Sequence, residues 1–476
     1  MLKTKLYIIF TMDEFHYKYN RFILPLYGMN RNIDYDQMLL KSNHIPHKYC
    51  IYDRVDMTDH NIFSIDPDGC EDADDAFSIY NEDEKIFLAI HIADPTEYIQ
   101  LNSPLWKDME TRVITRYPSN NPPIHMIPHD IMEKASLMNN LYGSIKLAIT
   151  VTTEIDKNMF QPTGQIKLLF TKIRVKKENA LSYREAAIKL YNTTIALCLR
   201  ISEELQRLRK RETKAVVLNE VANSYVIFNN NEPVLYSDDP TERLMKQMIA
   251  EFAIFANSFI GEYLKINFKS SGLYRTCPAK DWLHTLDDSM CGQELLNEII
   301  TNGIKAEYMS NVQSHDLVGA PEYVHFTSPI RRLTDCVCHY LLKYIHLKSI
   351  NNNVDIPFAD NQLEEYAATC SILSKKMKNV QYTDIKFRII QVIKGLLLDT
   401  QKVTLEYYVS SYKNGFLNII INKLNNHSIY FSYTLRIPNV KTNYILKQPY
   451  EITITCANVP NKFDQGTLPE LDSIFL

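Results

Sequence analysis

The chain has little of what marks several classes of protein. No run approaches the roughly 18 to 20 consecutive apolar residues that a membrane span needs. Glycine and proline number only 12 and 20 in 476 residues, which excludes collagen-like and low-complexity chains. The 9 cysteines form no Cys-x-x-Cys pair and are odd in number, which favours reduced thiols over a disulfide framework or a zinc ribbon. The opening stretch has no small-residue cleavage site, so we expect an intracellular, cytoplasmic protein.

An excess of positive charge is also absent. The chain has 52 Lys and Arg residues against 56 Asp and Glu residues, a formal net charge of −4. Because nucleic-acid-binding proteins usually have a basic surface, such a role here would require a basic channel inside an otherwise acidic exterior. The 45% of apolar residues is ordinary for a folded protein, and the length exceeds one domain of roughly 100 to 200 residues. These values predict one large body with a smaller satellite.

The patterning predicts strands first and helices later. Short apolar runs rich in β-branched and aromatic residues predict strands at 63–65, 77–80 and 86–92. Apolar residues at helical spacing predict one long helix from Tyr183 to Arg211, whose basic end suits a helix C-terminus.

Helix start signals predict three further helices. Asp239 and Glu242 stand three residues apart, which indicates a capping box at the start of a helix over 240–265. Two more helices are expected, one from Pro329 and one over 360–393.

Beyond Gly395 the pattern changes to alternation of apolar and polar residues. Asn414-Gly415, between two such runs, indicates a two-residue hairpin turn. Residues 396–476 are therefore expected to form a small all-β domain of the OB type. With the mixed strands and helices before it, this predicts an α+β protein.

The densest chemistry lies between Ser64 and Ala76. Six carboxylates fall within ten residues, namely Asp66, Asp68, Glu71, Asp72, Asp74 and Asp75. Such charges repel one another, so a folded protein tolerates them only if they are solvated or neutralised by cations. An acidic surface loop is the simpler interpretation. Apolar strands on both sides, with Pro67 and Gly69 as turn formers, favour instead a loop whose carboxylates converge.

Carboxylates without cysteine or histidine partners favour a hard cation. Oxygen ligands of this kind suit Mg²⁺ or Mn²⁺ better than zinc. A calcium-binding EF-hand needs glycine at loop position six and glutamate at position twelve, and counting from Asp66 these positions hold Glu71 and Phe77. The sequence therefore predicts a Mg²⁺ site, with Mn²⁺ as the alternative.

A second constellation runs from His325 to Arg332. Ser328 suits an N-cap and Pro329 the first helical position. Arg331 and Arg332 would then lie in the first helical turn, where the helix dipole disfavours cations. An anion at this terminus would remove the conflict, because backbone N–H groups and guanidinium forks both suit phosphate. The simpler alternative is two solvated arginines.

An acidic metal site together with an arginine phosphate site favours metal-assisted phosphodiester cleavage over acyl transfer or redox chemistry. The residues alone leave a Mg²⁺-dependent phosphatase or a DNA exonuclease open as an alternative.

These two segments resemble the signatures of the RNB exoribonucleases, the group of ribonuclease II, ribonuclease R and the catalytic subunit of the exosome. The four aspartates Asp66, Asp72, Asp74 and Asp75 stand at the family spacing, and 325–332 is similar to the second signature. The resemblance implies an RNB catalytic domain of mixed β-sheet surrounded by helices. The expected organisation is a short extension at 1–50 without a full OB-fold domain, the catalytic domain at 51–395, and the OB-like domain at 396–476.

The resemblance implies Mg²⁺-dependent hydrolysis of single-stranded RNA from its 3′ end to nucleoside 5′-monophosphates. In that family pattern Asp66, Asp72 and Asp75 would hold Mg²⁺. Asp74 would position the attacking water or a second ion.

Other residues match family positions that contact RNA. Arg331 would grip the scissile phosphate, with Arg332 as the alternative for that role. Tyr117 resembles the tyrosine that stacks on the terminal base, and Glu251 resembles the glutamate that contacts the last ribose. In contrast, His91, His325 and Asp94 are expected to be structural.

The sequence also departs from the family pattern. Members usually carry two OB-type domains before the catalytic domain, and residues 1–50 cannot hold one. We therefore expect reduced guidance of RNA, with a protein partner as the candidate replacement for those domains and no membrane partner. The alternative function is a catalytically silent RNB module that binds RNA or scaffolds a decay complex. Retention of the clustered carboxylates favours the enzyme, since a scaffold has no physical reason to keep them.

Overall fold

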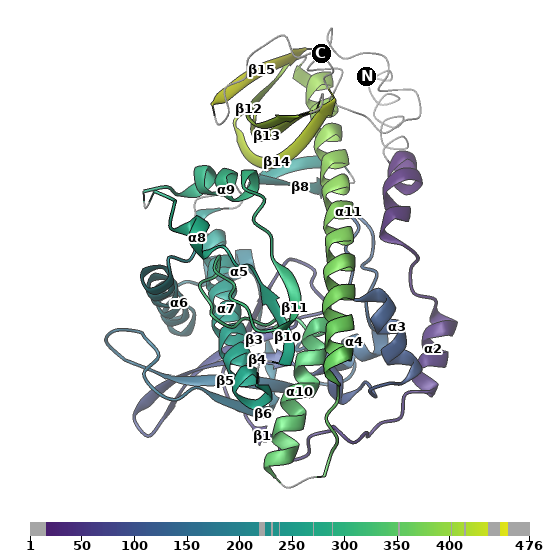
Figure 1. The fold of residues 1–476 in the computed structure, drawn as a ribbon, viewed down its shortest axis with the longest axis vertical. Helices are drawn as coiled ribbons and strands as arrows, with labels where there is room; N and C mark the ends of the chain where they lie inside the picture. The colour runs from purple at the N-terminus through teal and green to yellow at the C-terminus, as the bar shows by residue number, and fades with distance from the viewer. Residues whose placement is uncertain are drawn as a thin grey trace.

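The computed structural model describes residues 16–218, 224–229, 232–237, 239–269, 271–287, 289–350, 353–400, 402–413, 416–436 and 448–455. A curled sheet with helices around it forms the larger part, and a second sheet lies at the other end of one long helix, α11 (Asp360–Thr400) (Figure 1). This arrangement confirms the predicted α+β class. Within the described ranges, every helix is too short or too polar to cross a membrane.

The curled sheet has seven strands in the order β1-β6-β5-β4-β3-β2-β7. Their bounds are β1 Val55–Asp56, β2 Ile62–Asp66, β3 Asp75–Glu82, β4 Lys85–Ala93, β5 Lys146–Ile155, β6 Lys167–Ile173 and β7 Val175–Ser182. The pairs β1–β6 and β2–β7 are parallel and the others antiparallel. The strands predicted at 63–65, 77–80 and 86–92 correspond to β2, β3 and β4.

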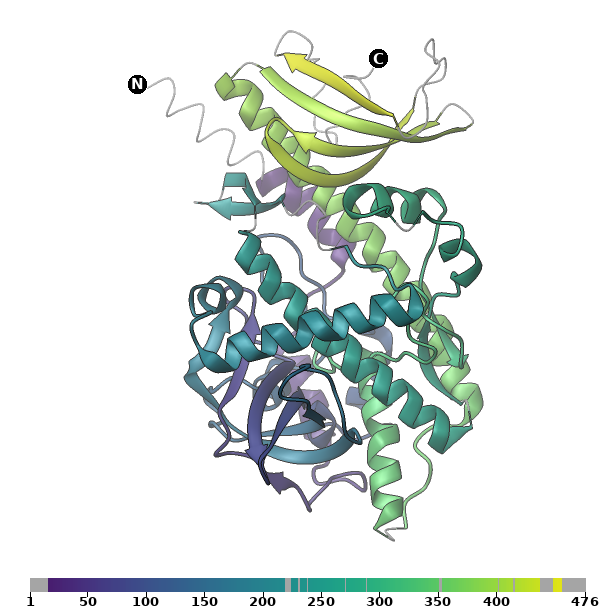
Figure 2. The same ribbon diagram turned by 90° about the vertical axis from the view of Figure 1, so that its left-hand side faces the viewer.

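Three helices cross the curled sheet (Figure 2). They are α5 (Tyr183–Ile188), α6 (Thr193–Thr213) and α7 (Pro240–Phe268). The ring of Phe77 on β3 meets Phe252 on α7 with centroids 5.7 Å apart, one contact of a core that continues through all three helices. Removing these apolar faces from water stabilises the layered arrangement.

The prediction of a single helix over 183–211 is wrong, because the helical conformation is interrupted between α5 and α6. Asn192 has extended backbone angles and its side chain accepts hydrogen bonds from Thr194 N–H and Ile195 N–H, so it caps a new helix. A short polar side chain that satisfies free N–H groups outweighs the continuous apolar spacing at this point.

The predicted start of α7 is confirmed in part. The Asp239 carboxylate accepts a hydrogen bond from Thr241 N–H at 2.8 Å, as an N-cap does. Glu242 does not complete a capping box, because its carboxylate accepts a bond from Tyr236 O–H at 2.9 Å instead.

The remaining elements connect these layers. They are η1 Tyr19–Ile23, η2 Leu24–Tyr27, α2 Ile33–Lys41, η3 Pro95–Glu97, α3 Pro104–Arg112, α4 His129–Ala135, β8 Ser224–Asn229, β9 Glu232–Ser237, β10 Ser271–Thr276, α8 Lys280–Leu283, α9 Gly292–Thr301, β11 Glu307–Asn311 and α10 Leu333–Ser349. Two-stranded sheets form between β8 and β9 and between β10 and β11.

The C-terminal part is the expected all-β unit. Its strands are β12 Lys402–Lys413, β13 Phe416–Leu424, β14 His427–Arg436 and β15 Pro449–Thr455, and they form an antiparallel sheet in the order β14-β13-β12-β15. The register pairs Lys413 with Phe416, while the predicted turn Asn414-Gly415 lies outside the described residues. Helix α11 runs through Gly395, so the change of character comes at the end of that helix.

A buried network of four charges links the segment around η3 to α10. Arg54 lies 2.6 Å from both Asp94 and Glu97, and Lys343 on α10 lies 3.1 Å and 2.7 Å from the same two carboxylates. Burial alone would raise the pKa of Asp94, but the charges of Lys343 and Arg54 outweigh burial and hold that pKa well below its usual range. Asp94 is therefore structural, and it links Arg54, which precedes β1, with Lys343 on α10.

We predict that Lys343→Met lowers the free energy of unfolding by about 3 to 5 kcal/mol at neutral pH, because it leaves two buried carboxylates with one cation. Chemical denaturation measures the change. Lys85→Met is the matched control, since Lys85 pairs with Glu154 on the surface, and it should change stability little. Equal effects of the two variants would contradict the role of burial.

The same network predicts a pH dependence. The pKa of Asp94 is lower in the folded state, so its contribution is present above the unfolded pKa of about 3.9 and is lost as the pH falls below it. The stability difference between wild type and Lys343→Met should therefore shrink on acidification.

Candidate active site

The acidic segment is a short loop between two neighbouring strands. Asp66 is the last residue of β2 and Asp75 the first of β3. Gly69 has φ +75°, in the left-handed region, and Cys70 N–H donates to Pro67 C=O at 3.1 Å. These features form the tight turn that the sequence predicted.

Backbone hydrogen bonds hold the second half of this loop in place. Leu137 N–H donates to Ala73 C=O at 3.0 Å, and Ala93 N–H donates to Asp74 C=O at 2.8 Å. The Ser136 hydroxyl donates to Glu71 C=O at 2.8 Å. The carboxylates therefore project from a fixed backbone, and the loop is not a loose surface excursion.

Asp74 is the most enclosed of the four predicted aspartates, with 3% of its surface exposed. One carboxylate oxygen accepts a hydrogen bond from Ile330 N–H at 2.8 Å, and the other lies 3.0 Å from Nε of Arg331. Burial raises the pKa of Asp74 well above its usual range, although the Arg331 charge opposes this. Both predicted signatures thus meet at one buried carboxylate.

Arg331 and Arg332 lie in a turn before α10, so the predicted helix start at Pro329 is wrong. Arg331 N–H and Arg332 N–H both donate to Ser328 C=O, and Arg332 then adopts an extended conformation with φ −137°. Leu333 N–H bonds to Val113 C=O at 2.8 Å, and this pairing with the segment after α3 delays the helix. The conflict with the helix dipole therefore does not arise, because neither arginine lies in the first helical turn.

Asp335 shapes this turn. Its buried carboxylate accepts hydrogen bonds from Ser328 N–H at 2.8 Å, from Arg332 at 2.8 Å and from the Thr334 hydroxyl at 3.0 Å. Arg332 is thereby directed at Asp335, and its charge opposes the effect of burial on the pKa of Asp75. Arg331 remains half exposed, with 47% of its side chain accessible, and a second contact to the Ser328 hydroxyl at 3.0 Å orients its guanidinium.

Two of the other three aspartates, Asp66 and Asp72, accept a hydrogen bond from a neighbouring side chain. The Ser64 hydroxyl donates to Asp66, while Asp72 accepts a bond from Tyr117 O–H at 2.7 Å. Burial raises the pKa of Asp66 and of Asp75. Across the described ranges no three His, Cys, Asp or Glu side chains are grouped to hold a metal ion. Metal ligation by Asp66, Asp72, Asp74 and Asp75 therefore stays a prediction.

Two tyrosines border the carboxylates. Tyr117 is partly exposed and bonds to Asp72, so its ring lies beside the acidic loop. Tyr183, at the start of α5, was not singled out from the sequence. Burial raises its pKa, and the charges of Asp75 and Asp66 add to that increase. Tyr183 directly follows β7, the strand that pairs with the end of β2. This position in the sequence of predicted strands could have indicated that Tyr183 lies near the acidic loop.

Glu251 lies on α7, away from solvent. Its carboxylate pairs with Arg209 on α6 and accepts a bond from Gln206 at 3.2 Å. No contact described for Glu251 reaches the acidic loop or Arg331, so its predicted role toward a ribose is untested by this arrangement.

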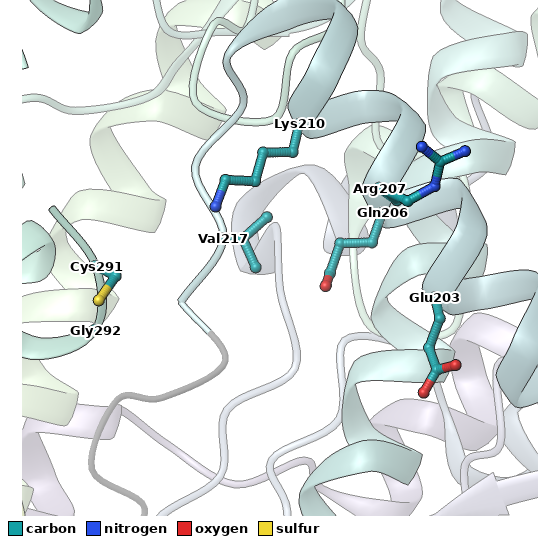
Figure 3. Close-up of a pocket in the computed structure, with 7 residues that line it drawn as sticks. All are labelled: Glu203, Gln206, Arg207, Lys210, Val217, Cys291 and Gly292. Atoms are coloured by element: carbon teal, nitrogen blue, oxygen red, sulfur yellow. The ribbon is translucent and has the colours of Figure 1, made fainter. Parts of the chain in front are cut away.

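A pocket of about 310 Å³ lies beside α6 and includes Gln206, which also contacts Glu251 (Figure 3). Its lining residues are Glu203, Gln206, Arg207, Lys210, Val217, Cys291 and Gly292. Lys210 on α6 extends toward Cys291 across the opening, while Arg207 points away from it (Figure 3). None of the four aspartates lines this pocket, whose charged wall is separate from the acidic loop.

Two histidines that the sequence analysis assigned to structure are enclosed. His91 bonds to the Ser78 and Thr150 hydroxyls at 3.0 and 2.9 Å, and burial lowers its pKa to about 3. His325 contacts the Tyr308 hydroxyl at 2.7 Å, and burial lowers its pKa as well. Neither faces the carboxylates through a hydrogen bond of its own.

The sequence of residues 54–348 matches the RNB domain family. The chain belongs to the RNB family. Ribonuclease R of Ureaplasma parvum is 27% identical in an alignment 344 residues long that covers 61% of this chain and 46% of that protein. The Schizosaccharomyces pombe exosome complex exonuclease dis3 is 24% identical in an alignment 464 residues long that covers 86% of this chain and 45% of that protein. This RNB chain thus spans about half the length of these curated relatives.

Solved structures share the RNB fold with this chain. Mycoplasma genitalium RNase R, in complex with ribose-methylated single-stranded RNA, superposes with a TM-score of 0.69 at 20% identity, covering 90% of this chain and 70% of that one. Yeast Ssd1, a pseudonuclease, superposes with a TM-score of 0.59 at 16% identity, covering 77% and 49%. The fold is therefore found both in a ribonuclease and in a pseudonuclease.

We predict that Asp335→Asn lowers the free energy of unfolding by about 1 to 3 kcal/mol, because a buried neutral amide cannot satisfy all three donors of the turn. Asp72→Asn is the control, since it removes a half-buried charge among like charges and should leave stability unchanged or raised. Thermal melts of both variants test this. Equal losses would show that the turn does not depend on Asp335.

Proposed function

We propose that this RNB protein is a Mg²⁺-dependent 3′-to-5′ exoribonuclease that hydrolyses single-stranded RNA to nucleoside 5′-monophosphates. The observation that carries the proposal is the meeting of Asp74 with Arg331 at the edge of a loop that also presents Asp66, Asp72 and Asp75. The named ribonuclease relatives support the same chemistry.

The chemistry of the donors suits a divalent cation, although no three of them are grouped as metal ligands among the described residues. Asp66, Asp72 and Asp75 offer only hard carboxylate oxygens, and Arg331 is the cation that contacts the loop while Arg332 pairs with Asp335. Four carboxylates near one guanidinium leave an excess of negative charge that Mg²⁺ or Mn²⁺ would neutralise. When bound, such an ion polarises a phosphate and lowers the pKa of a water molecule.

The protein side chains would supply position and charge. Arg331 is held at Nε by Asp74 and is half exposed, so N–H groups of its fork remain for a scissile phosphate. Asp74, fixed by Ile330 N–H, would orient the attacking water. Tyr117 would stack on the terminal base beside Asp72.

We predict that Asp74→Asn abolishes RNA hydrolysis while RNA binding stays intact or tightens, because a carboxylate that repels phosphate is removed. The assay follows 5′-labelled single-stranded RNA on a gel, with Mg²⁺ or with EDTA. Wild-type turnover by this variant would disprove the assignment. Wild-type protein that binds RNA but never cleaves it would favour a pseudonuclease of the kind that Ssd1 represents.

Arg331→Lys should lose on the order of 100-fold or more in turnover, because an ammonium cannot reproduce a planar two-point grip on phosphate. Arg332→Lys is the matched control, since Arg332 is directed at Asp335, and it should lose far less. If Arg332→Lys is the more impaired variant in single-turnover assays, the phosphate role belongs to Arg332.

A further inference from the structure

The N-terminal segment at 19–27 packs beside the loop that carries Tyr117. Its apolar side chains form a small core of their own with that loop and with α11. The buried members are Tyr19, Ile23, Tyr27, Ile124, Met377, Val380 and Phe387. This core is separate from the main core under the curled sheet. A segment that the sequence predicted only as an extension is thus part of the surroundings of Tyr117.

Asp384 on α11 lies at the centre of this small core and is 1% exposed. Its carboxylate accepts hydrogen bonds from Tyr19 O–H at 2.9 Å and from Tyr27 O–H at 2.7 Å. Ser119 donates twice, from N–H at 3.2 Å and from its hydroxyl at 2.9 Å, and Arg388 lies 3.0 Å away. One buried charge therefore joins the N-terminal segment, the Tyr117 loop and α11.

The chain is attached to this assembly on both sides of Tyr117. Arg116 donates to Tyr27 C=O at 2.6 Å, and Ser119 binds Asp384 on the other side. Gly28 makes room for the first contact, because it has φ +88° and a Cβ atom there would lie 2.7 Å from Nη1 of Arg116. Tyr117, held between these two attachments, extends its hydroxyl to Asp72.

We propose that Asp384 is a positioning residue that sets the place of Tyr117 over the acidic loop, and that the segment at 19–28 acts in the same assembly. The proposal rests on the proposed function, in which Tyr117 contacts RNA. A carboxylate can accept from several donors at once, whereas an amide presents its own N–H groups to some of them. Asp384→Asn must therefore break at least one hydrogen bond to Ser119 or to the two tyrosines. The loop that carries Tyr117 is then held by fewer contacts.

The test is a double-mutant cycle between Asp384→Asn and Tyr117→Ala, read as KM and kcat on single-stranded RNA. Asp384→Asn alone should raise KM on the order of tenfold, as a displaced substrate contact does. In the Tyr117→Ala background the same change should have almost no further effect, because its target is gone. Effects that add in the double variant would overturn the proposal, since a general loss of structure acts regardless of Tyr117. Glu406→Gln, which breaks an ion pair with Lys423 in the C-terminal sheet, is the control and should leave KM unchanged.

Hydrogen exchange provides a readout that does not need activity. In Asp384→Asn, and in the milder variant Tyr27→Phe, exchange should accelerate in the peptide 115–124 and stay unchanged in the curled sheet. Unchanged exchange in that peptide overturns the proposal, whatever the enzyme assay shows. If wild-type protein does not degrade RNA, the proposed function fails, and exchange in 115–124 still decides whether Asp384 positions the Tyr117 loop.

Discussion

The contact of the Asp74 carboxylate with Ile330 N–H and Arg331 is the constraint on which the site depends. It joins two segments 256 residues apart, one at the edge of the curled sheet and the other in front of α10. A buried carboxylate is expensive unless donors surround it, so each segment is held in place by the other. The backbone bonds of Ala73 and Asp74 to Leu137 and Ala93 then transmit this position to the whole acidic loop.

The same constraint explains why the two arginines behave differently. Asp335 takes Arg332 into a buried turn, and this leaves Arg331 to face both Asp74 and solvent. The turn that holds Arg332 also depends on the backbone hydrogen bond between Leu333 and Val113. Val113 has a φ of +63°, which is unusual for a β-branched residue. Strain of this kind costs of order 1 to 3 kcal/mol, and it persists where surrounding contacts determine the conformation. The conformation of Val113 brings the segment that leads to Tyr117 alongside Arg331.

The elements that were predicted correctly are those that depend on interactions between residues close together in the sequence. The strands around the acidic loop, the N-cap at Asp239 and the change to all-β structure after α11 all follow from short-range periodicity and capping, and the structure contains them. The start of α10 and the break at Asn192 were missed, because a long-range backbone pairing and a side-chain cap outweighed helical spacing. The aspartates and Arg331 could be found from their spacing. Asp384 could not, since its importance comes from partners far away in the chain.

Stability alone gives no reason for the acidic loop. Burial raises the pKa of Asp66, Asp74 and Asp75, which means that the folded state disfavours their charged forms. Amide or apolar side chains in these places would fold with less repulsion, as replacements of buried charges often do. Departures from the most stable choice are expected where a protein binds or reacts. Because Arg331 and the Tyr117 loop border the same carboxylates, the cost is concentrated where the proposed function would place a phosphate and a base, and this is the physical support for that proposal over a scaffold.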